Sequence, residues 1–226
     1  MWNNYFWNIQ KKYSMRVSQK QPLVIRLDGK DATKNKEIDL LDKSEEGFLS
    51  ALIKSACYFS QKYKCYAIIG SDEISFICEN PMDIIEDMGS DKSPHSNEII
   101  SVFSQLFFQY FNHFDKHKIV YWHAKCFSIP SEKIGSYIKY RSRIIENVLV
   151  TYFLKKNGVK LDDTSISEKI KACEKLGGYK DFETYKSGLL YYCGKEISLE
   201  DFLNNGEIVI KEKSEEDIND MFSEII

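Results

Sequence analysis

The order of apolar patterns along this chain predicts an α+β fold, an antiparallel βαββαβ sheet with both of its helices on one face. A short apolar run at 22–28 indicates a buried strand, and two strand-like runs at 65–69 and 74–78 indicate a hairpin. An amphipathic helical pattern precedes this hairpin and another follows it. An alternating, aromatic run at 118–129 then completes the ferredoxin-like order of strand, helix, strand, strand, helix, strand.

The local signals around these elements set their expected limits. Asp42 and Ser44 can cap a first helix that begins with Glu45, because apolar residues then recur at helical spacing as far as Tyr63. The hairpin turn at 70–73 reads Gly-Ser-Asp-Glu, which favours a tight turn with acids at its tip. We therefore expect the acids of the hairpin to lie at one edge of the sheet.

Irregular sequence separates the hairpin from the second helix. Residues 79–97 hold two prolines and a glycine, so we expect a surface loop there, too irregular for the core, with room for one helical turn. Apolar residues at helical spacing over 99–114 then predict the second helix.

The remaining sequence predicts a long helix and a mixed extension. A stripe of apolar positions marks a third helix over 131–156, with Asn157-Gly158 as its stop. A capping box at 165–168 predicts a short helix, the runs 188–193 and 207–211 could pair as strands, and 215–225 suggests a last helix. We expect residues 1–156 to form the core with an N-terminal segment, and 157–226 a C-terminal extension or small appendage of helices and strands.

Composition narrows the class of protein. The chain has 226 residues, of which 43% are hydrophobic and 29% charged, as in soluble globular proteins. No run approaches the length of about 18 apolar residues that spans a membrane, and the N-terminus lacks the pattern of a signal peptide, so we expect a cytoplasmic protein with no membrane partner. The six cysteines are scattered without metal-ligand spacing, so no zinc site is expected.

The net charge of −3 does not indicate a nucleic-acid-binding domain, which is usually basic. Any contact with nucleic acid must therefore involve a local patch. Two basic clusters are candidates, although such runs are more often solvated faces: Lys11, Lys12, Arg16 and Lys20, and Lys139, Arg141, Arg143, Lys155 and Lys156.

Three carboxylates are expected to meet at one edge of the predicted sheet. Asp28 ends the first strand, and Asp72 and Glu73 lie at the tip of the neighbouring hairpin. Like charges at close range favour either a proton or a counter-cation, and oxygen ligands of this kind suit Mg²⁺. Two such ions can activate an attacking oxygen and stabilise a leaving pyrophosphate, with Mn²⁺ as a possible substitute. The acids thus predict catalysis of nucleotidyl transfer, although each acid alone is also ordinary turn chemistry.

Several segments resemble one family of enzymes. The segments 24–30, Val-Ile-Arg-Leu-Asp-Gly-Lys, and 70–76, Gly-Ser-Asp-Glu-Ile-Ser-Phe, are similar to motifs of the tRNA-histidine guanylyltransferase family and its Thg1-like relatives. Weaker likenesses lie at 124–130, Ala-Lys-Cys-Phe-Ser-Ile-Pro, at 137–141, Tyr-Ile-Lys-Tyr-Arg, and at 186–188, Lys-Ser-Gly. The resemblance implies a polymerase-type palm that adds nucleotides in the 3′-5′ direction to the 5′ end of a tRNA or tRNA-like RNA, using ATP or GTP.

The resemblance, which spans roughly residues 20–195, also implies roles for residues. It places two Mg²⁺ ions on Asp28, the Gly29 carbonyl and Asp72, with Glu73 as a further acid of the catalytic and metal site. It implies a homo-oligomer, a tetramer. The nucleotide would be bound by the turn after the first strand and by two residues further on: Gly29, Lys30, Asp31, Thr33, Lys34, Ser71 and Arg141.

Two departures from the family pattern bear on substrate choice. Ala32 stands where relatives carry an aromatic residue after the Asp-Gly pair, which removes a platform for stacking a base. Glu146-Asn147-Val148-Leu149 stands where relatives carry His-x-Asn-Asn. We therefore expect template pairing, rather than recognition of histidine tRNA, to select the nucleotide.

Two other functions are compatible with a palm. A nucleotide cyclase or signalling-nucleotide synthase uses the same acid geometry on two triphosphates, but the Gly-Gly-Asp/Glu-Glu-Phe hairpin of diguanylate synthesis is missing. A degenerate palm could serve as an RNA-binding module, yet that interpretation predicts loss of acids that this chain retains.

Overall fold

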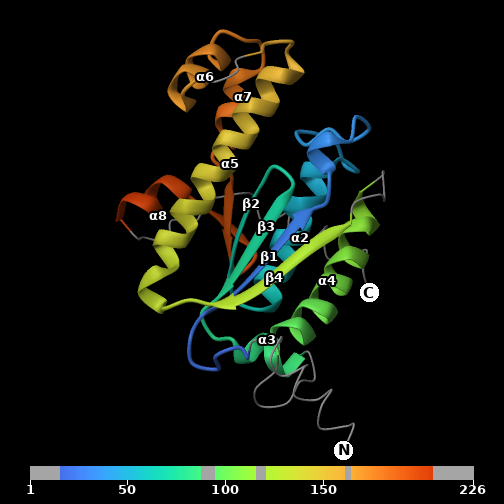
Figure 1. Cartoon of the computed structure of the whole chain (residues 1–226), viewed down its shortest axis with the longest axis vertical. Helices are drawn as coiled ribbons and strands as arrows, with labels where there is room; N and C mark the ends of the chain where they lie inside the picture. The colour runs from blue at the N-terminus through green and yellow to red at the C-terminus, as the bar shows by residue number, and fades with distance from the viewer. Residues whose placement is uncertain (1–15, 88–94, 116–120, 161–163, 206–226) are drawn as a thin grey trace, which may run out of the picture.

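The computed structural model describes residues 16–87, 95–115, 121–160 and 164–205, and these form one six-stranded antiparallel sheet with helices on both faces (Figure 1). The strand order is β4-β1-β3-β2-β5-β6. Its first four members have the ferredoxin-like arrangement, so the predicted βαββαβ fold is confirmed. The strands are β1 (Leu23–Gly29), β2 (Tyr66–Gly70), β3 (Glu73–Cys78), β4 (Trp122–Ser128), β5 (Leu189–Tyr192) and β6 (Lys195–Ile197).

Helices α2 (Phe48–Lys62) and α4 (Ser96–Phe114) cover one face of the sheet. Successive side chains of β1 point to opposite faces of the sheet, and those of Leu23, Ile25 and Leu27 belong to the apolar core beneath these helices. Aromatic rings from both helices and from β3 fill this core, with centroids 5.3 to 6.1 Å apart among Phe59, Phe76, Phe103 and Phe107. Aromatic and aliphatic side chains therefore dominate the core on this face.

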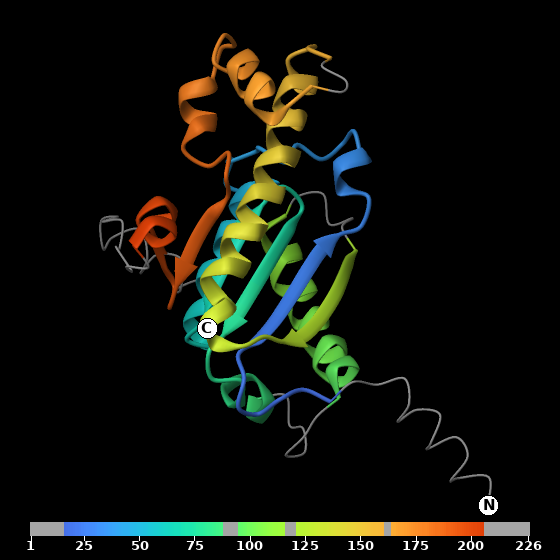
Figure 2. The same ribbon diagram turned by 60° about the vertical axis from the view of Figure 1, so that its left-hand side comes forward.

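Helix α5 (Ile134–Lys156) lies on the opposite face and begins directly after a short 3₁₀ turn, η2 (Ser131–Lys133). Ile138, Ile145 and Leu149 pack with Val24 and Ile68 in a second apolar cluster. The helix ends as predicted: Asn157 is its C-cap, and Gly158 follows with a φ of 75°. Figure 2 shows α5 beside β2 and β3, with β1 and β4 lying farther along the sheet.

Two local expectations are wrong. Helix α2 begins at Phe48 rather than Glu45, because the Asp42 carboxylate accepts the backbone N–H of Ser44 (2.9 Å) in a turn. Residues 79–97 contain the helical turn that the sequence allowed, α3 (Met82–Asp87), but this turn buries Ile84 and Ile85 in the core, from which the segment was expected to be excluded.

The C-terminal part of the described chain completes the sheet. β5 pairs with β2 on one side and with β6 on the other. The sequence suggested residues 207–211 as a partner for this strand, whereas β6 consists of Lys195–Ile197. The predicted strand at 207–211 and helix at 215–225 lie outside the described residues. Helices α6 (Ile166–Cys173), whose capping box is present, α7 (Tyr179–Glu183), which the sequence did not indicate, and α8 (Leu199–Asn205) complete the extension. None of the described helices has the length and apolarity that a membrane span requires.

Candidate active site

The acids predicted from the sequence lie on two adjacent central strands and in the turn that leads into the second of them. Asp28 stands directly opposite Glu73 in the antiparallel register of β1 and β3. The backbone N–H of Gly29 donates to the carbonyl of Asp72 at 2.6 Å, which joins the end of β1 to the hairpin tip. The predicted juxtaposition of β1 with the β2–β3 turn is therefore present.

Asp72 is held by the turn and by the segment after β1. Ser71 has a φ of 60°, in the left-handed region, and its Oγ donates to Asp72 Oδ1 at 2.7 Å. Burial raises the pKa of Asp72, and the nearby charge of Asp28 raises it further, while bonds from Ser71 and from the Thr33 backbone lower it. Two partly shielded carboxylates thus repel each other at this edge of the sheet.

Glu73 has different surroundings from the two aspartates. Its carboxylate accepts Arg141 Nε at 2.9 Å, a short bond from the Arg141 terminal nitrogen, and Arg26 Nη2 at 3.1 Å. The side chains of Glu73 and Arg141 are only 7% and 6% exposed. Arg26 also binds Asp28, while its Nε is buried without a partner. The expectations of Glu73 as a metal ligand and Arg141 as a phosphate ligand gain no support from this pairing.

The segment after β1 forms a surface turn beside the acids. Asp31 has a φ of 58° and precedes the single 3₁₀ turn η1 (Ala32–Lys34). Lys34 Nζ lies 2.8 Å from Asp31 Oδ1, and this bond lowers the pKa of the Asp31 carboxyl. Lys30 is exposed, and its backbone N–H donates to the carbonyl of Tyr121 at 2.7 Å. Lys30 has no carboxylate partner within the described ranges, so its charge is available to a ligand.

The oxygen donors at this edge fit Mg²⁺. No group of three or more His, Cys, Asp or Glu residues in the described part of the chain is arranged to hold a metal ion. Mg²⁺, however, is commonly bound through one or two carboxylates, with water and substrate phosphates as its other ligands. Asp28 and Asp72 supply two carboxylates whose repulsion a cation would relieve. Gly29 follows Asp28 directly, and its N–H donates to the Asp72 carbonyl, so the Gly29 carbonyl belongs to the same end of β1.

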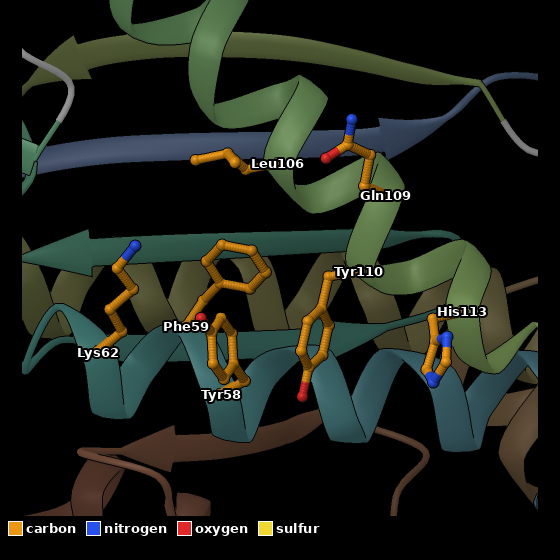
Figure 3. Close-up of a pocket in the computed structure, with 7 residues that line it drawn as sticks. All are labelled: Tyr58, Phe59, Lys62, Leu106, Gln109, Tyr110 and His113. Atoms are coloured by element: carbon orange, nitrogen blue, oxygen red, sulfur yellow. The ribbon is translucent and has the colours of Figure 1, made fainter. Parts of the chain in front are cut away.

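Two cavities lie apart from the acids. One of about 420 Å³ lies between α2 and α4 and contains none of the predicted site residues (Figure 3). Another of about 620 Å³ lies along α5 and near α8, and Glu146 and Ser187 line it. Ser187 Oγ donates to Glu146 Oε1 at 3.0 Å. Glu146, the first residue of the segment that departs from the resembling family, therefore belongs to this second cavity.

Arg26 is the site residue whose role was missed from the sequence. The alternation of β1 was a usable signal, because it places Arg26 and Asp28 on the same face. The pairing of Arg26 and Arg141 with Glu73 could not be identified from sequence alone. Arg26 precedes Glu73 by 47 residues, and Arg141 follows Glu73 by 68 residues.

Comparisons with known proteins give a consistent fold. No protein-family model and no curated protein sequence matches the chain. A bacterial tRNA(His) guanylyltransferase (Thg1)-like protein in complex with GTP matches with a TM-score of 0.64 at 16% identity, over 87% of this chain and 85% of that chain. A bacterial Thg1-like protein in complex with ATP matches with a TM-score of 0.63 at 14% identity, over 87% and 86%.

A eukaryotic enzyme structure also matches this chain. The tRNA(His) guanylyltransferase of Saccharomyces cerevisiae matches with a TM-score of 0.59 at 17% identity, over 94% of this chain and 98% of that chain. All three matches cover at least 85% of both chains. The chain therefore has the fold of the tRNA(His) guanylyltransferases and Thg1-like proteins.

Proposed function

We propose that this chain is a metal-dependent nucleotidyltransferase that adds nucleotides to the 5′ end of a tRNA or tRNA-like RNA in the 3′-5′ direction. The observation that carries the proposal is the pair of neighbouring carboxylates, Asp28 near the end of β1 and Asp72 in the β2–β3 turn, which the Gly29–Asp72 backbone hydrogen bond joins. The fold supports it, because the similar bacterial proteins were solved in complex with GTP and ATP.

Asp28, Asp72 and the Gly29 carbonyl would hold the metal, which supplies charge stabilisation to the reacting phosphates. Ser71 and the Thr33 backbone orient the Asp72 carboxylate through the hydrogen bonds they donate. Arg26 holds Asp28 in place. Glu73 anchors the two arginines on this face, so its proposed role is positioning.

The triphosphate would lie against the turn after β1. Lys30 offers a free cation, and Lys34 can exchange its exposed contact with Asp31 for a phosphate oxygen. Backbone N–H groups of such a turn can add further donors to an anion. This arrangement recognises phosphates rather than a base, and it suits ATP and GTP equally.

The selection of the nucleotide is proposed to come from the template. Ala32 is 1% exposed and packs into the core, so it offers no ring to an incoming base. Glu146 accepts a hydrogen bond from Ser187, and both residues line a cavity that contains neither Asp28 nor Asp72. Watson–Crick pairing with an opposing strand would then supply the specificity.

A transfer assay with the purified chain tests this proposal. Each labelled triphosphate is offered to a tRNA lacking its first 5′ nucleotide and to full-length histidine tRNA, with Mg²⁺ or with a chelator. We expect Mg²⁺-dependent addition of the nucleotide that pairs with the template base. Guanosine addition that ignores the template base contradicts templating, and a new product formed from triphosphate alone indicates a cyclase instead.

A further inference from the structure

The face of β4 beside Asp28 is exposed. In the antiparallel register, His123 stands opposite Asp28, Lys125 opposite Arg26, and Phe127 opposite Val24. All three β4 residues are exposed, while the alternate residues of the strand are half-buried on the α4 side. Figure 2 shows β1 and β4 side by side, with α5 lying mainly over β2 and β3. A row of side chains therefore extends along β4 and ends next to the acids.

Aromatic rings continue this row at the start of α5. Phe127 meets Tyr137 edge-on at 5.9 Å, and Tyr140 lies 6.4 Å from Tyr137. The Tyr137 hydroxyl is fixed by Ser75 at 3.2 Å, whereas Phe127 is 36% and Tyr140 56% exposed. Two rings that are exposed to solvent thus flank a third that is held in place. We call His123, Lys125, Phe127, Tyr137 and Tyr140 the β4 platform.

The charges of this face favour a phosphate-bearing partner. Asp28 and Glu73, the carboxylates that β1 and β3 place on it, are already bound by Arg26 and Arg141. Lys125 forms no ion pair with a carboxylate anywhere in the ranges that the structure describes. The positive charge that remains lies among exposed rings, which is the combination that binds single-stranded nucleic acid through its backbone and its bases.

We propose that the β4 platform binds the unpaired nucleotides of the strand that overhangs a 5′-truncated RNA end. The choice of this RNA rests on the proposed function. Removal of 5′ nucleotides leaves the opposing bases unpaired, and unpaired bases can stack on Phe127 and Tyr140 while Lys125 contacts a phosphate. His123 lies opposite Asp28, so the platform leads the strand towards the acids.

Binding of RNA without triphosphate or metal tests the platform independently of transfer. Fluorescence anisotropy compares a hairpin with a 3′ overhang and the same hairpin with a blunt end. The chain is measured as wild type, Lys125→Ala and Phe127→Leu, which keeps an apolar contact for Tyr137. The matched control is Lys195→Ala, an exposed lysine of β6 at the far edge of the sheet.

We expect the wild type and Lys195→Ala to bind the overhang more tightly than the blunt end. Lys125→Ala and Phe127→Leu should each lose about fivefold or more of the affinity for the overhang, with little change for the blunt end. Equal binding of all four proteins to the overhang overturns the proposal. The proposal is also overturned if Lys125→Ala self-associates while its RNA binding is unchanged. That result would mean that Lys125 only prevents the edge strand β4 from pairing with β4 of a second molecule. Loss of transfer with intact platform binding contradicts the proposed function alone.

Discussion

The two faces of the sheet use the same strand for different purposes. On one face Leu23, Ile25 and Leu27 of β1 meet an aromatic core, and on the other Arg26 and Asp28 meet charged partners. The alternation of a strand makes this separation possible, since adjacent residues point to opposite sides. The comparison indicates that one face of β1 contributes only to the core, whereas the other combines the apolar cluster under α5 with the charged groups of the candidate site.

The polar face itself contains two kinds of acid. Glu73 is fully paired with guanidinium groups, whereas Asp72 is half-buried with only neutral donors and faces the negative charge of Asp28. Ion-paired acids stabilise the fold, whereas an acid whose charge is disfavoured in the folded protein is a candidate for cation binding. The difference assigns a structural role to Glu73 and a chemical role to Asp72, while Asp28, which pairs with Arg26, lies next to Asp72.

The largest expected effect is that of Asp72→Asn on catalysis. The amide keeps the size and the acceptor oxygen of the aspartate but loses the charge that would bind a metal. Nucleotide transfer should fall about a thousandfold or more, because metal stabilisation of phosphate charge is worth several kcal/mol. Single-turnover rates with saturating Mg²⁺ measure the loss, and near-normal transfer would contradict the metal assignment.

The same variant should not lose stability in the absence of metal. A raised pKa in the folded state means that Asp72 favours folding at low pH, and that this contribution disappears as pH rises through the raised value. Ionised Asp72 therefore opposes folding at pH values above its raised pKa, and Asp72→Asn should raise the melting temperature in that pH range. Mg²⁺ affinity of the wild type should weaken on acidification at a pH above the ordinary aspartate range.

Phe107→Ala tests the opposite face. The ring is fully buried, and its centroid lies 4.9 Å from that of the Trp122 ring and 6.1 Å from that of the Phe76 ring. Its removal should lower the free energy of unfolding by about 3–5 kcal/mol, measured by denaturant unfolding. The rate per folded molecule should stay near the wild-type value, and a selective loss of rate would show that the two faces are coupled.

Glu73→Gln should have a smaller effect on stability. The amide leaves Arg26 and Arg141 with an uncharged partner in a buried place, and hydrogen bonds to charged groups contribute about 1.5–3 kcal/mol. We expect a loss of about 2 kcal/mol in the free energy of unfolding, with Mg²⁺ affinity retained in calorimetric titration. A loss of Mg²⁺ binding as complete as in Asp72→Asn would place Glu73 among the metal ligands.

Periodicity predicted much of this arrangement from sequence. Strand and helix patterns are local, so the βαββαβ order and the convergence of Asp28 with the hairpin could be inferred from residues 22–129. The helix start at Phe48 was missed because Asp42 binds the backbone of Ser44 in a turn instead of capping a helix. The pairing of Glu73 with Arg141 depends on how α5 lies across the sheet, which is a property of packing and not of spacing.

The smallest expected effect is that of Lys30→Ala on nucleotide binding. Lys30 is exposed and has no carboxylate partner in the described part of the chain, so its removal costs the fold little. A charge-assisted contact to phosphate at such a solvated position should contribute about 1 kcal/mol, or about fivefold in affinity for a triphosphate. Lys36→Ala is the matched control, because Lys36 is an exposed lysine of the segment that follows the η1 turn. Titration of ATP and GTP in the presence of Mg²⁺ compares the two variants. An equal loss in both would reflect the general charge of the segment, whereas a loss confined to Lys30→Ala would identify the turn after β1 as the triphosphate site.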